Sequence, residues 1–476
     1  MRAFVLPLCA GLLVTGCAGH QRYDHARIIV APAGAEPHLP ARPGFDPQQP
    51  LGLEQAVRLA LANNPDMHIA TERLAAANAR LRQSRAAFLP LVQAHAEYVR
   101  ADAPSTYLFK TIDQRELPQR VDFNDPGILD NYEIGLGLRY NLYNGGRDRL
   151  DRLTAALGVR QGTTRRLAAR NRLIAAVIVA WYDIRSAGEM VTTAKASHTA
   201  VEAQLDETRK VHAAGGDARK SDVLSLEARV AEAEETVIRA RNAQRLAVAA
   251  LANLLGENPD TVLDMQLGEA CPCPIPATYE DAVATGLAGR PELVLARQEV
   301  EGAAIARDRA RAEWLPRLDL EARTWWDDDH IDFGEDDGNW MLGLRLGWDV
   351  YTGGARIHRG AAARSELRAA VAADRRENLV VRLEIKRAYL QLEEAQARRD
   401  VAVKGLAAAE ESLAMVRTQY QAGSVRITRY LEAETTHTRA RMRLVRARYD
   451  LKQAEAEVAR ATGRFAHAEL DPEESP

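Results

Sequence analysis

The sequence has 476 residues, enough for two or three domains, and its 63 Lys and Arg residues nearly balance 66 Asp and Glu residues. Without an excess of positive charge there is no electrostatic reason to expect nucleic acid as a partner. Aromatic residues make up only 5% of the chain. Alanine is frequent, and this composition favours closely packed helices over a thick globular core.

The N-terminus is typical of a bacterial lipoprotein. Arg2 precedes an apolar run from Ala3 to Val14, and Gly16-Cys17 follows shortly after. We predict a lipoprotein signal peptide over residues 1–17, with Cys17 lipidated in the mature protein. The alternative is an ordinary signal peptide in which Cys17 is incidental. Because Ala18 rather than Asp follows the cysteine, the segment resembles lipoproteins that are sorted to the outer membrane.

Residues 18–50 are rich in proline and have no hydrophobic period, so we predict an extended N-terminal tether there. After residue 17 no apolar run reaches the roughly 18 residues of a membrane-spanning helix. If the mature protein crosses a bilayer, it must therefore do so with strands.

The first structural repeat is predicted over residues 51–270. A helix begins near Leu53, and Asn63-Asn64-Pro65 interrupts it. A second helix then runs to about Phe88, where Leu89-Pro90 ends it, because proline does not continue a helix.

Two strands follow in this repeat, at about 90–100 and 133–143, with a long mixed loop between them. In the second strand apolar and polar positions alternate, as they do in a strand with one face of each kind. One face carries Ile134, Leu136, Leu138, Tyr140 and Leu142, and the other carries Gly135, Gly137, Arg139 and Asn141.

The motif Tyr143-Asn144-Gly145-Gly146-Arg147 ends the second strand and recurs as Tyr351-Thr352-Gly353-Gly354-Ala355-Arg356. The duplication predicts a second structural repeat over 279–463, with strands at about 316–326 and 340–351. The acidic loop between these strands lacks the spacing of a calcium loop and is interpreted as a solvated turn. The last strand alternates Leu342, Leu344, Leu346, Trp348 and Val350 with Gly343, Arg345, Gly347 and Asp349.

Residues 271–278 are predicted to link the repeats, and residues 464–476 to form a C-terminal tail. Cys271 and Cys273 lie in the linker. Two thiolates without further ligands do not fill a tetrahedral metal site, and a disulfide between residues two apart is strained. We therefore interpret the segment as a linker only.

Each Gly-Gly pair is followed by a long stretch without proline, between Pro126 and Pro259 and between Pro316 and Pro472. One helix from Arg147 to about residue 214 would be about 100 Å long at 1.5 Å per residue. The helices that return carry heptads, which predict coiled-coil packing with close backbones at alanine positions. The clearest column is Ala433, Ala440, Ala447, Ala454 and Ala461.

Four strands do not close a barrel, and open sheet edges are not tolerated in lipid, so the chain must oligomerise. From Leu53 to Gly463 the order is Leu-Pro, strand, Tyr-x-Gly-Gly, long helix and a hairpin of the type Gly-x5-Asp-Val-Leu. This order of motifs occurs nearly completely in both repeats. In it the chain resembles the TolC-like outer membrane efflux factor family, and the N-terminus resembles that of a lipoprotein member. The resemblance implies a mixed α and transmembrane β fold. In it, duplicated coiled-coil hairpins and four strands per chain close as a homotrimer into one 12-stranded outer-membrane β-barrel and a periplasmic α-helical barrel.

The same resemblance implies a duct rather than an enzyme. We expect an outer-membrane channel of a tripartite efflux pump, anchored in outer-membrane lipid through Cys17. It would passively conduct substrates from a periplasmic adaptor and an inner-membrane transporter to the outside. The alternatives are the exit duct of a type I protein secretion system and a non-conducting coiled-coil envelope spacer. No catalytic order, metal-ligand motif or phosphate-binding loop is found, so no cofactor and no metal are expected.

The resemblance also implies where the channel works. Its periplasmic mouth would lie at the hairpins 215–225 and 423–432. The positions that match family residues for adaptor docking are Gly216, Leu224, Gly423 and Leu431. Asp222 and Glu432 match acidic positions of the aperture, whereas Arg429 replaces the acid equivalent to Asp222. We therefore expect these three residues at the gate, with Asp222 and Arg429 as a latch between hairpins or as ordinary solvated charges.

We expect the alternating strands to place side chains on two sides of the barrel. Arg139, Arg345 and Asp349 are expected to face the water-filled lumen. Five apolar side chains are expected to face lipid, because a slip of one residue would put charge into hydrocarbon. These are Leu136, Leu138, Leu342, Leu344 and Trp348.

Overall fold

The structure, a computed structural model, describes residues 51–116, 119–120, 122, 124–216, 219–263, 265, 275–331 and 338–466. The described residues belong to one compact unit, Pro47–Pro476. Several predicted features lie outside the described residues. These are the signal peptide with Cys17, the tether, Cys271 and Cys273, most of the acidic loop and the tail beyond residue 466.

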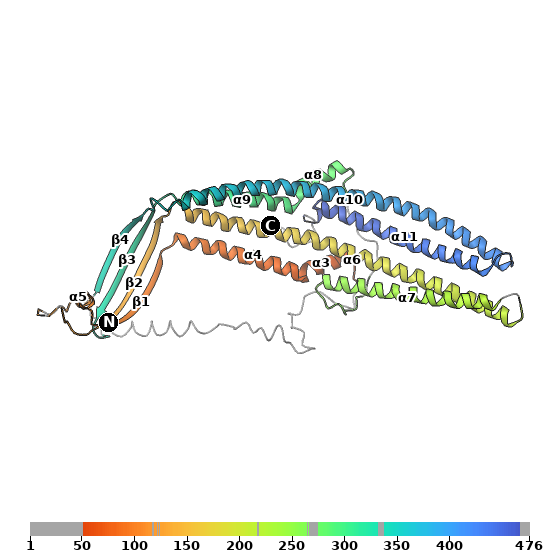
Figure 1. Ribbon diagram of the computed structural model, residues 1–476, viewed down its shortest axis with the longest axis horizontal. Helices are drawn as coiled ribbons and strands as arrows, with labels where there is room; N and C mark the ends of the chain where they lie inside the picture. Colours follow the sequence, from red (N-terminus) through yellow and green to blue (C-terminus); the bar gives the residue numbers. More distant parts are fainter. Residues whose placement is uncertain are drawn as a thin grey trace. The chain divides into compact units, whose positions relative to one another are not determined.

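The first half contains two short helices, two strands with a small helix between them, and a long helical hairpin (Figure 1). These elements are α3 (Leu53–Asn63), α4 (Pro65–Gln83), the 3-10 helix η1 (Ser84–Phe88), β1 (Leu91–Ala101), α5 (Pro104–Asp113), β2 (Leu129–Tyr143), α6 (Arg147–Ala213) and α7 (Lys220–Leu254).

The second half repeats this order without the small helix between its strands. Its elements are α8 (Tyr279–Gly289), α9 (Pro291–Ala312), β3 (Arg317–Asp328), β4 (Gly338–Gly347), α10 (Ala355–Gln421), α11 (Ile427–Ala461) and the 3-10 helix η2 (Arg464–Ala466). The expected combination of long helical hairpins with four strands is confirmed.

The four strands form one antiparallel sheet in the order β1-β2-β3-β4. Glu133 pairs with Asp327 at the end far from the helices, and Arg139 pairs with Glu321 nearer to them. Because paired residues point to the same side, the register puts the polar positions of neighbouring strands on one face of the sheet. The alternation seen in the sequence therefore extends across the sheet.

Two strand boundaries differ by four residues from the sequence prediction, and the others lie within two residues of it. β2 begins at Leu129, earlier than the expected residue 133. β4 ends at Gly347, which pairs with Arg317 at the start of β3. The residue before Arg317 is Pro316, which has no amide hydrogen to extend the ladder. Asp349 therefore lies beyond the strand, so the alternation of β4 does not place it on the polar face.

The Gly-Gly pairs form the corners between strands and long helices. Gly145 has φ +74°, and a Cβ atom there would lie 2.7 Å from the carbonyl oxygen of Ala312. Gly146 has φ +79° at the N-cap of α6, and Gly354 has φ +83° at the N-cap of α10. Residues with side chains rarely adopt this left-handed conformation. The duplicated motif thus encodes a turn that occurs twice.

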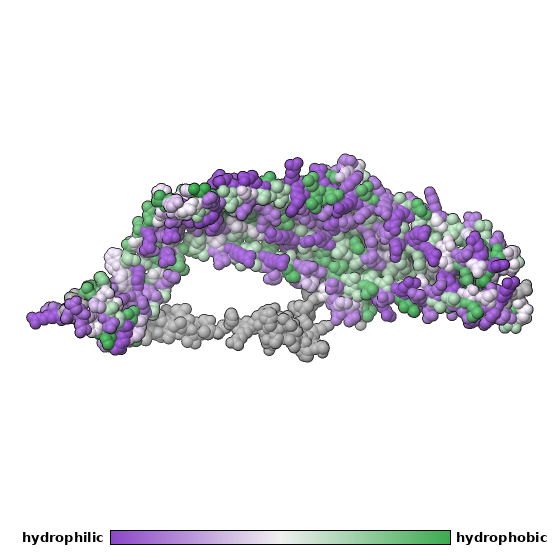
Figure 2. All heavy atoms as spheres, in the orientation of Figure 1, coloured by the Kyte–Doolittle hydropathy of each residue, from purple (hydrophilic) through white to green (hydrophobic). Residues whose placement is uncertain are grey.

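The long helices change neighbours along their length. Beside the sheet α4, α6, α9 and α10 pack in this order, and nearer the hairpin turns the order is α7, α6, α11 and α10. The alanine column of α11 is buried throughout, as coiled-coil packing requires. Figure 2 shows hydrophilic and hydrophobic residues interspersed over the visible face of the helices. Among the described helices, none combines the length and hydrophobicity needed to cross a bilayer.

Candidate functional site

The sheet has one face of charged and small residues and one of exposed apolar residues. On the polar face Glu321 of β3 lies between two arginines from its neighbours. Its carboxylate is 3.1 Å from Arg345 Nη2 and 3.9 Å from Arg139 Nε. On the opposite face the exposed side chains include Leu136, Trp340, Leu342, Leu344 and Leu346. The sheet therefore separates a water-compatible surface from a lipid-compatible one.

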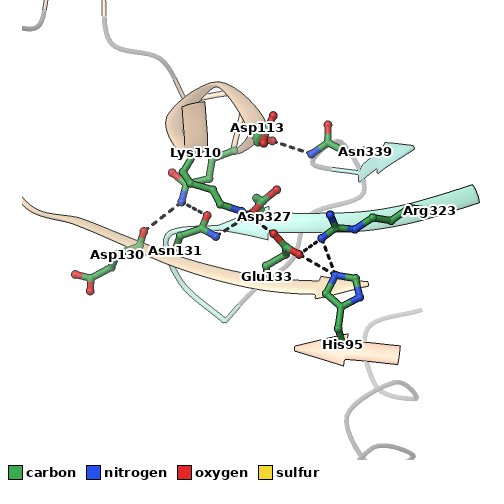
Figure 3. Close-up of polar contacts among 10 residues, drawn as sticks. His95, Lys110, Asp113, Asp130, Asn131, Glu133, Arg323, Asp327 and Asn339 are labelled. Carbon is green, nitrogen blue, oxygen red and sulfur yellow. Dashed lines mark hydrogen bonds and ion pairs between the residues drawn. The ribbon is translucent and has the colours of Figure 1, made fainter. Parts of the chain in front are cut away.

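At the end of the sheet far from the long helices (Figure 1), α5 lies over the polar face, and its Lys110 is directed at the strands (Figure 3). Lys110 of α5 points into the sheet between two acids. Its Nζ atom is 2.6 Å from Glu133 Oε2 and 2.9 Å from Asp327 Oδ1. Asp327 is 0% exposed, and buried charges of this kind need a paired partner. Lys110 pairs with both acids, and Glu133 has Arg323 of β3 and His95 of β1 as further partners.

Further bonds attach α5 to three strands. Gln114 Nε2 donates to Asn131 Oδ1 of β2 at 2.8 Å, and Asn131 Nδ2 donates to Asp327 Oδ1 of β3 at 2.9 Å. Asn339 Nδ2 of β4 donates to the carbonyl oxygen of Asp113 at 3.1 Å. The last bond satisfies one of the free carbonyls at the helix C-terminus. The small helix is thus bound across β2, β3 and β4.

The charges at this contact shift two pKa values within α5. Burial of the ammonium group acts to lower the pKa of Lys110, but its hydrogen bonds to Glu133 and Asp327 outweigh burial and hold the pKa above its ordinary value. Burial also raises the pKa of Asp113, and the negative charge of Asp327 adds to this effect. Lys110 therefore stays charged throughout the neutral range.

The two hairpin turns have the same helix ending. Gly215 has φ +75° and Gly423 has φ +72°. In the first turn the amide of Gly216 donates to the Val211 carbonyl, and in the second the amide of Ser424 donates to Gln419. This is the Schellman pattern, and it makes Gly215 the structural counterpart of Gly423. Gly216, which the sequence analysis set beside Gly423 as a docking position, lies one residue after this counterpart, because the second turn is one residue shorter.

The expected gate residues lie near the turns, each with a partner close in sequence. Asp222 Oδ2 accepts a hydrogen bond from the backbone amide of Arg219 at 3.2 Å, which caps α7. Arg429 Nη1 donates to Glu432 Oε2 at 3.2 Å on the exposed surface of α11. Among the described contacts of one chain, Asp222 and Arg429 do not pair with each other, so a latch would need a neighbouring copy.

The expected docking leucines differ in their surroundings. Leu224 is 52% exposed, whereas Leu431 is partly buried against a core cluster where the two hairpin ends pack together. The core of this cluster is Val201, Leu205, Val223, Leu226, Val416, Ile427, Tyr430 and Ala433. Between α7 and α11 lies an open groove of about 680 Å³, lined by Leu431, Arg429 and Glu432 among others.

One buried ion pair near the turns was not foreseen from the sequence. Glu434 of α11 is 3% exposed, and its Oε2 atom is 3.0 Å from Arg229 Nη2 of α7. Ser197 of α6 donates to the other carboxylate oxygen at 2.5 Å. The pair therefore joins the two return helices directly, and Ser197 attaches α6 to it. Only the position of Glu434 directly after Ala433 of the buried column hinted that it faces inward.

The acidic loop shows one group with metal-ligand spacing, Asp328, Asp329 and His330, whose ligand atoms lie within 4.8 Å of one another. A hydrogen bond to Asp329 raises the pKa of His330 above its ordinary value. Asp328 and Asp329 are half-buried and His330 is exposed, and we assign the group no metal.

These features define a class of protein. Its chain is mostly helical with two long hairpins, and it carries a sheet with one polar and one apolar face. The edge strands β1 and β4 of this sheet are open in the described chain. The model of the Outer membrane efflux protein family matches residues 56–257 and 283–464. The chain belongs to this family, and the resemblance to TolC-like channels is confirmed. Members of the family are channels and not enzymes.

Similar proteins are found by sequence and by structure. Protein CyaE of Bordetella pertussis is 26% identical over 481 residues, 99% of this chain and 97% of that protein. The alkaline protease secretion protein AprF of Pseudomonas aeruginosa is 29% identical over 285 residues, 58% of this chain and 55% of that protein. The Campylobacter jejuni CmeC outer membrane channel has a TM-score of 0.75 at 18% identity, covering 86% of this chain and 85% of that chain. The last comparison shows the fold.

Proposed function

We propose that this protein is an outer-membrane exit duct that conducts substrates passively outward from a periplasmic adaptor and an inner-membrane transporter. The observation that carries the proposal is the two-faced sheet continued by helices of 67 residues. Such helices are about 100 Å long. A sheet with an apolar side suits a bilayer, and helices of this length suit a conduit across the periplasm. No catalytic role is proposed.

The open edges of the sheet support a homotrimer. β1 and β4 each lack a partner on one side within the described chain, and lipid does not tolerate unpaired backbone groups. Three copies would join β4 of one to β1 of the next and close twelve strands. In that barrel Arg139 and Arg345 face the lumen together with Glu321, and the exposed leucines face lipid.

The turn ends of the hairpins are the proposed docking surface for the adaptor. The exposed Leu224, the turn residues Gly216 and Gly423, and Leu431 beside the groove between α7 and α11 support this assignment. We also propose that Cys17 carries the lipid anchor. Mass spectrometry of the mature N-terminus tests the anchor, and an unmodified N-terminus would reject it.

A second candidate is protein secretion, and one observation favours it. The relative AprF is named for secretion of alkaline protease. Deleting the gene distinguishes the two routes. Loss of a protein from the culture medium would support secretion, whereas intracellular accumulation of small toxic compounds would support efflux.

Reconstitution of the full-length protein in a planar bilayer tests the proposed duct. We expect discrete single-channel current steps from the purified trimer, and larger steps when charges at the expected gate are removed. If neither the wild type nor the gate variants Asp222→Gln and Arg429→Ala produce current steps, the protein is a spacer and the duct is rejected.

A further inference from the structure

The small helix α5 has two chemically different sides. The side on the sheet carries Lys110, Gln114 and the buried Thr111. On the opposite side Phe109 is 66% exposed and Ile112 is 47% exposed. Large apolar side chains that project together from a bound helix leave an apolar surface without a partner in the described chain, and such a surface usually marks an interaction site.

The position of α5 decides what that surface faces. Lys110 binds Glu133 and Asp327, and these acids share the polar face of the sheet with Glu321, Arg139 and Arg345. In the proposed trimer this face surrounds the lumen. The side of α5 that points away from the sheet therefore points toward the three-fold axis.

The radius of the proposed barrel and the width of α5 place the α5 helices of the three copies close to one another. Twelve strands spaced about 4.8 Å apart and tilted by about 40° enclose a barrel with a radius of roughly 12 Å. A helix with its side chains is about 10 Å across. Three α5 helices against the inner wall therefore leave no wide opening between them, and their Phe109 and Ile112 side chains come close to the axis.

We propose that α5 helices from three copies of this chain form an apolar plug at the outer mouth of the channel, with Phe109 and Ile112 at its centre. The inference rests on the proposed trimeric duct. Apolar constrictions close a pore by expelling water from it. Lys110 holds each α5 helix on the inner face of the barrel, because its ammonium group pairs with acids of two different strands.

Cross-linking of the full-length protein tests the contact between copies. Phe109→Cys is made with Cys271 and Cys273 replaced by serine, and the trimer is treated with a short bifunctional maleimide. We expect covalent dimers and trimers on a denaturing gel. Val262→Cys is the control, since Val262 is 81% exposed but lies beyond α7, and we expect it to be labelled without cross-linking.

Conductance gives the second readout. Replacing Phe109 and Ile112 by serine should raise the single-channel conductance severalfold. The matched control is Ile128→Ser, which changes another exposed apolar residue between β1 and β2 and should leave the conductance unchanged. An intact trimer without Phe109→Cys cross-links, or an unchanged conductance in the double variant, overturns the plug alone. A protein that is monomeric in every variant overturns the proposed duct as well.

Discussion

Arg290 Nη1 donates a hydrogen bond to the carbonyl oxygen of Ala461 at 3.1 Å, which joins the start of α9 to the last residue of α11. The first half has the equivalent bond, from Asn64 Nδ2 to the carbonyl oxygen of Leu254 at 2.9 Å. In both halves the residue before the proline that opens a helix caps the end of the return helix. The two repeats thus share this connection although its side chains differ.

Replacing Arg290 by alanine should destabilise the protein more than Asn64→Ala does. Arg290 is 3% exposed and also binds Glu292 and Glu384, both at 2.9 Å. Removing one partner of a buried ion pair typically costs about 3 kcal/mol or more. The side chain of Asn64 makes two neutral hydrogen bonds, to Leu254 and to the amide of Asp66, and each contributes about 1 kcal/mol. Thermal unfolding followed by circular dichroism checks this order. Equal shifts of the midpoint for the two variants would show that the acids do not depend on Arg290.

The alanine column of α11 should not accept larger side chains. Ala447 is buried between packed helices, so Ala447→Leu should cost about 1–3 kcal/mol through overpacking. Its counterpart in the first half is Ala240, which is only half-buried. Ala240→Leu should change stability by less than about 0.5 kcal/mol. Unfolding midpoints of the two variants provide the measurement, and a tolerated Ala447→Leu would contradict close packing at this seam.

The two faces of the sheet should differ in access to water. Leu344→Cys should be protected from a water-soluble maleimide in lipid, whereas Gly343→Cys should react, because neighbouring positions point to opposite faces. Gly343 accepts the change sterically, since nothing lies within 4 Å of a Cβ atom placed there. A reactive Leu344→Cys beside a protected Gly343→Cys would invert the assignment of lipid and lumen.

The gate charges should act together if they form a latch between copies. Asp222→Gln removes the charge but keeps an acceptor at the third helical position that caps α7. We expect Asp222→Gln and Arg429→Ala each to raise the closed-state conductance, and the double variant to add little more. Additive effects would mean that the two charges act separately, and no change in any variant would remove them from the gate.

Lys110 should keep α5 on the sheet throughout the neutral range. Its pKa in the folded protein is raised above the ordinary value of 10.5. Ion pairs of such a group stabilise the folded state below the unfolded pKa, and this contribution is lost as the pH rises through the folded pKa. The conductance attributed to plug opening should therefore stay constant from about pH 7 to about pH 9 and rise only above about pH 10.

Lys110→Met is the control for this pH dependence. The variant leaves Asp327 without its ammonium partner and leaves Glu133 with Arg323 and His95, which should weaken the attachment of α5 by about 1–3 kcal/mol. Its conductance should be raised already at neutral pH and should lack the alkaline step. An alkaline step that persists in Lys110→Met would assign it to another group.

Local patterns in the sequence determined much of this protein. The alternation around Leu136 and Leu344 defined two-faced strands, because side chains of a strand point to opposite sides in turn. The repeated Gly145-Gly146 and Gly353-Gly354 marked the corners, and the alanine heptad of α11 marked a close seam. Each of these features depends on residues only a few positions apart.

Tertiary structure decided the features that depend on distant partners. Lys110 and Asp327 lie 217 residues apart, so no local period could place α5 on the polar face. The burial of Glu434 depends on Arg229 and Ser197, which belong to two other helices. β4 ends before Asp349 because its partner strand β3 begins directly after Pro316, which cannot extend the ladder. Backbone angles were needed to identify Gly215 as the counterpart of Gly423. Gly215 and Gly216 are equivalent in sequence, but only Gly215 adopts the left-handed conformation that ends the helix.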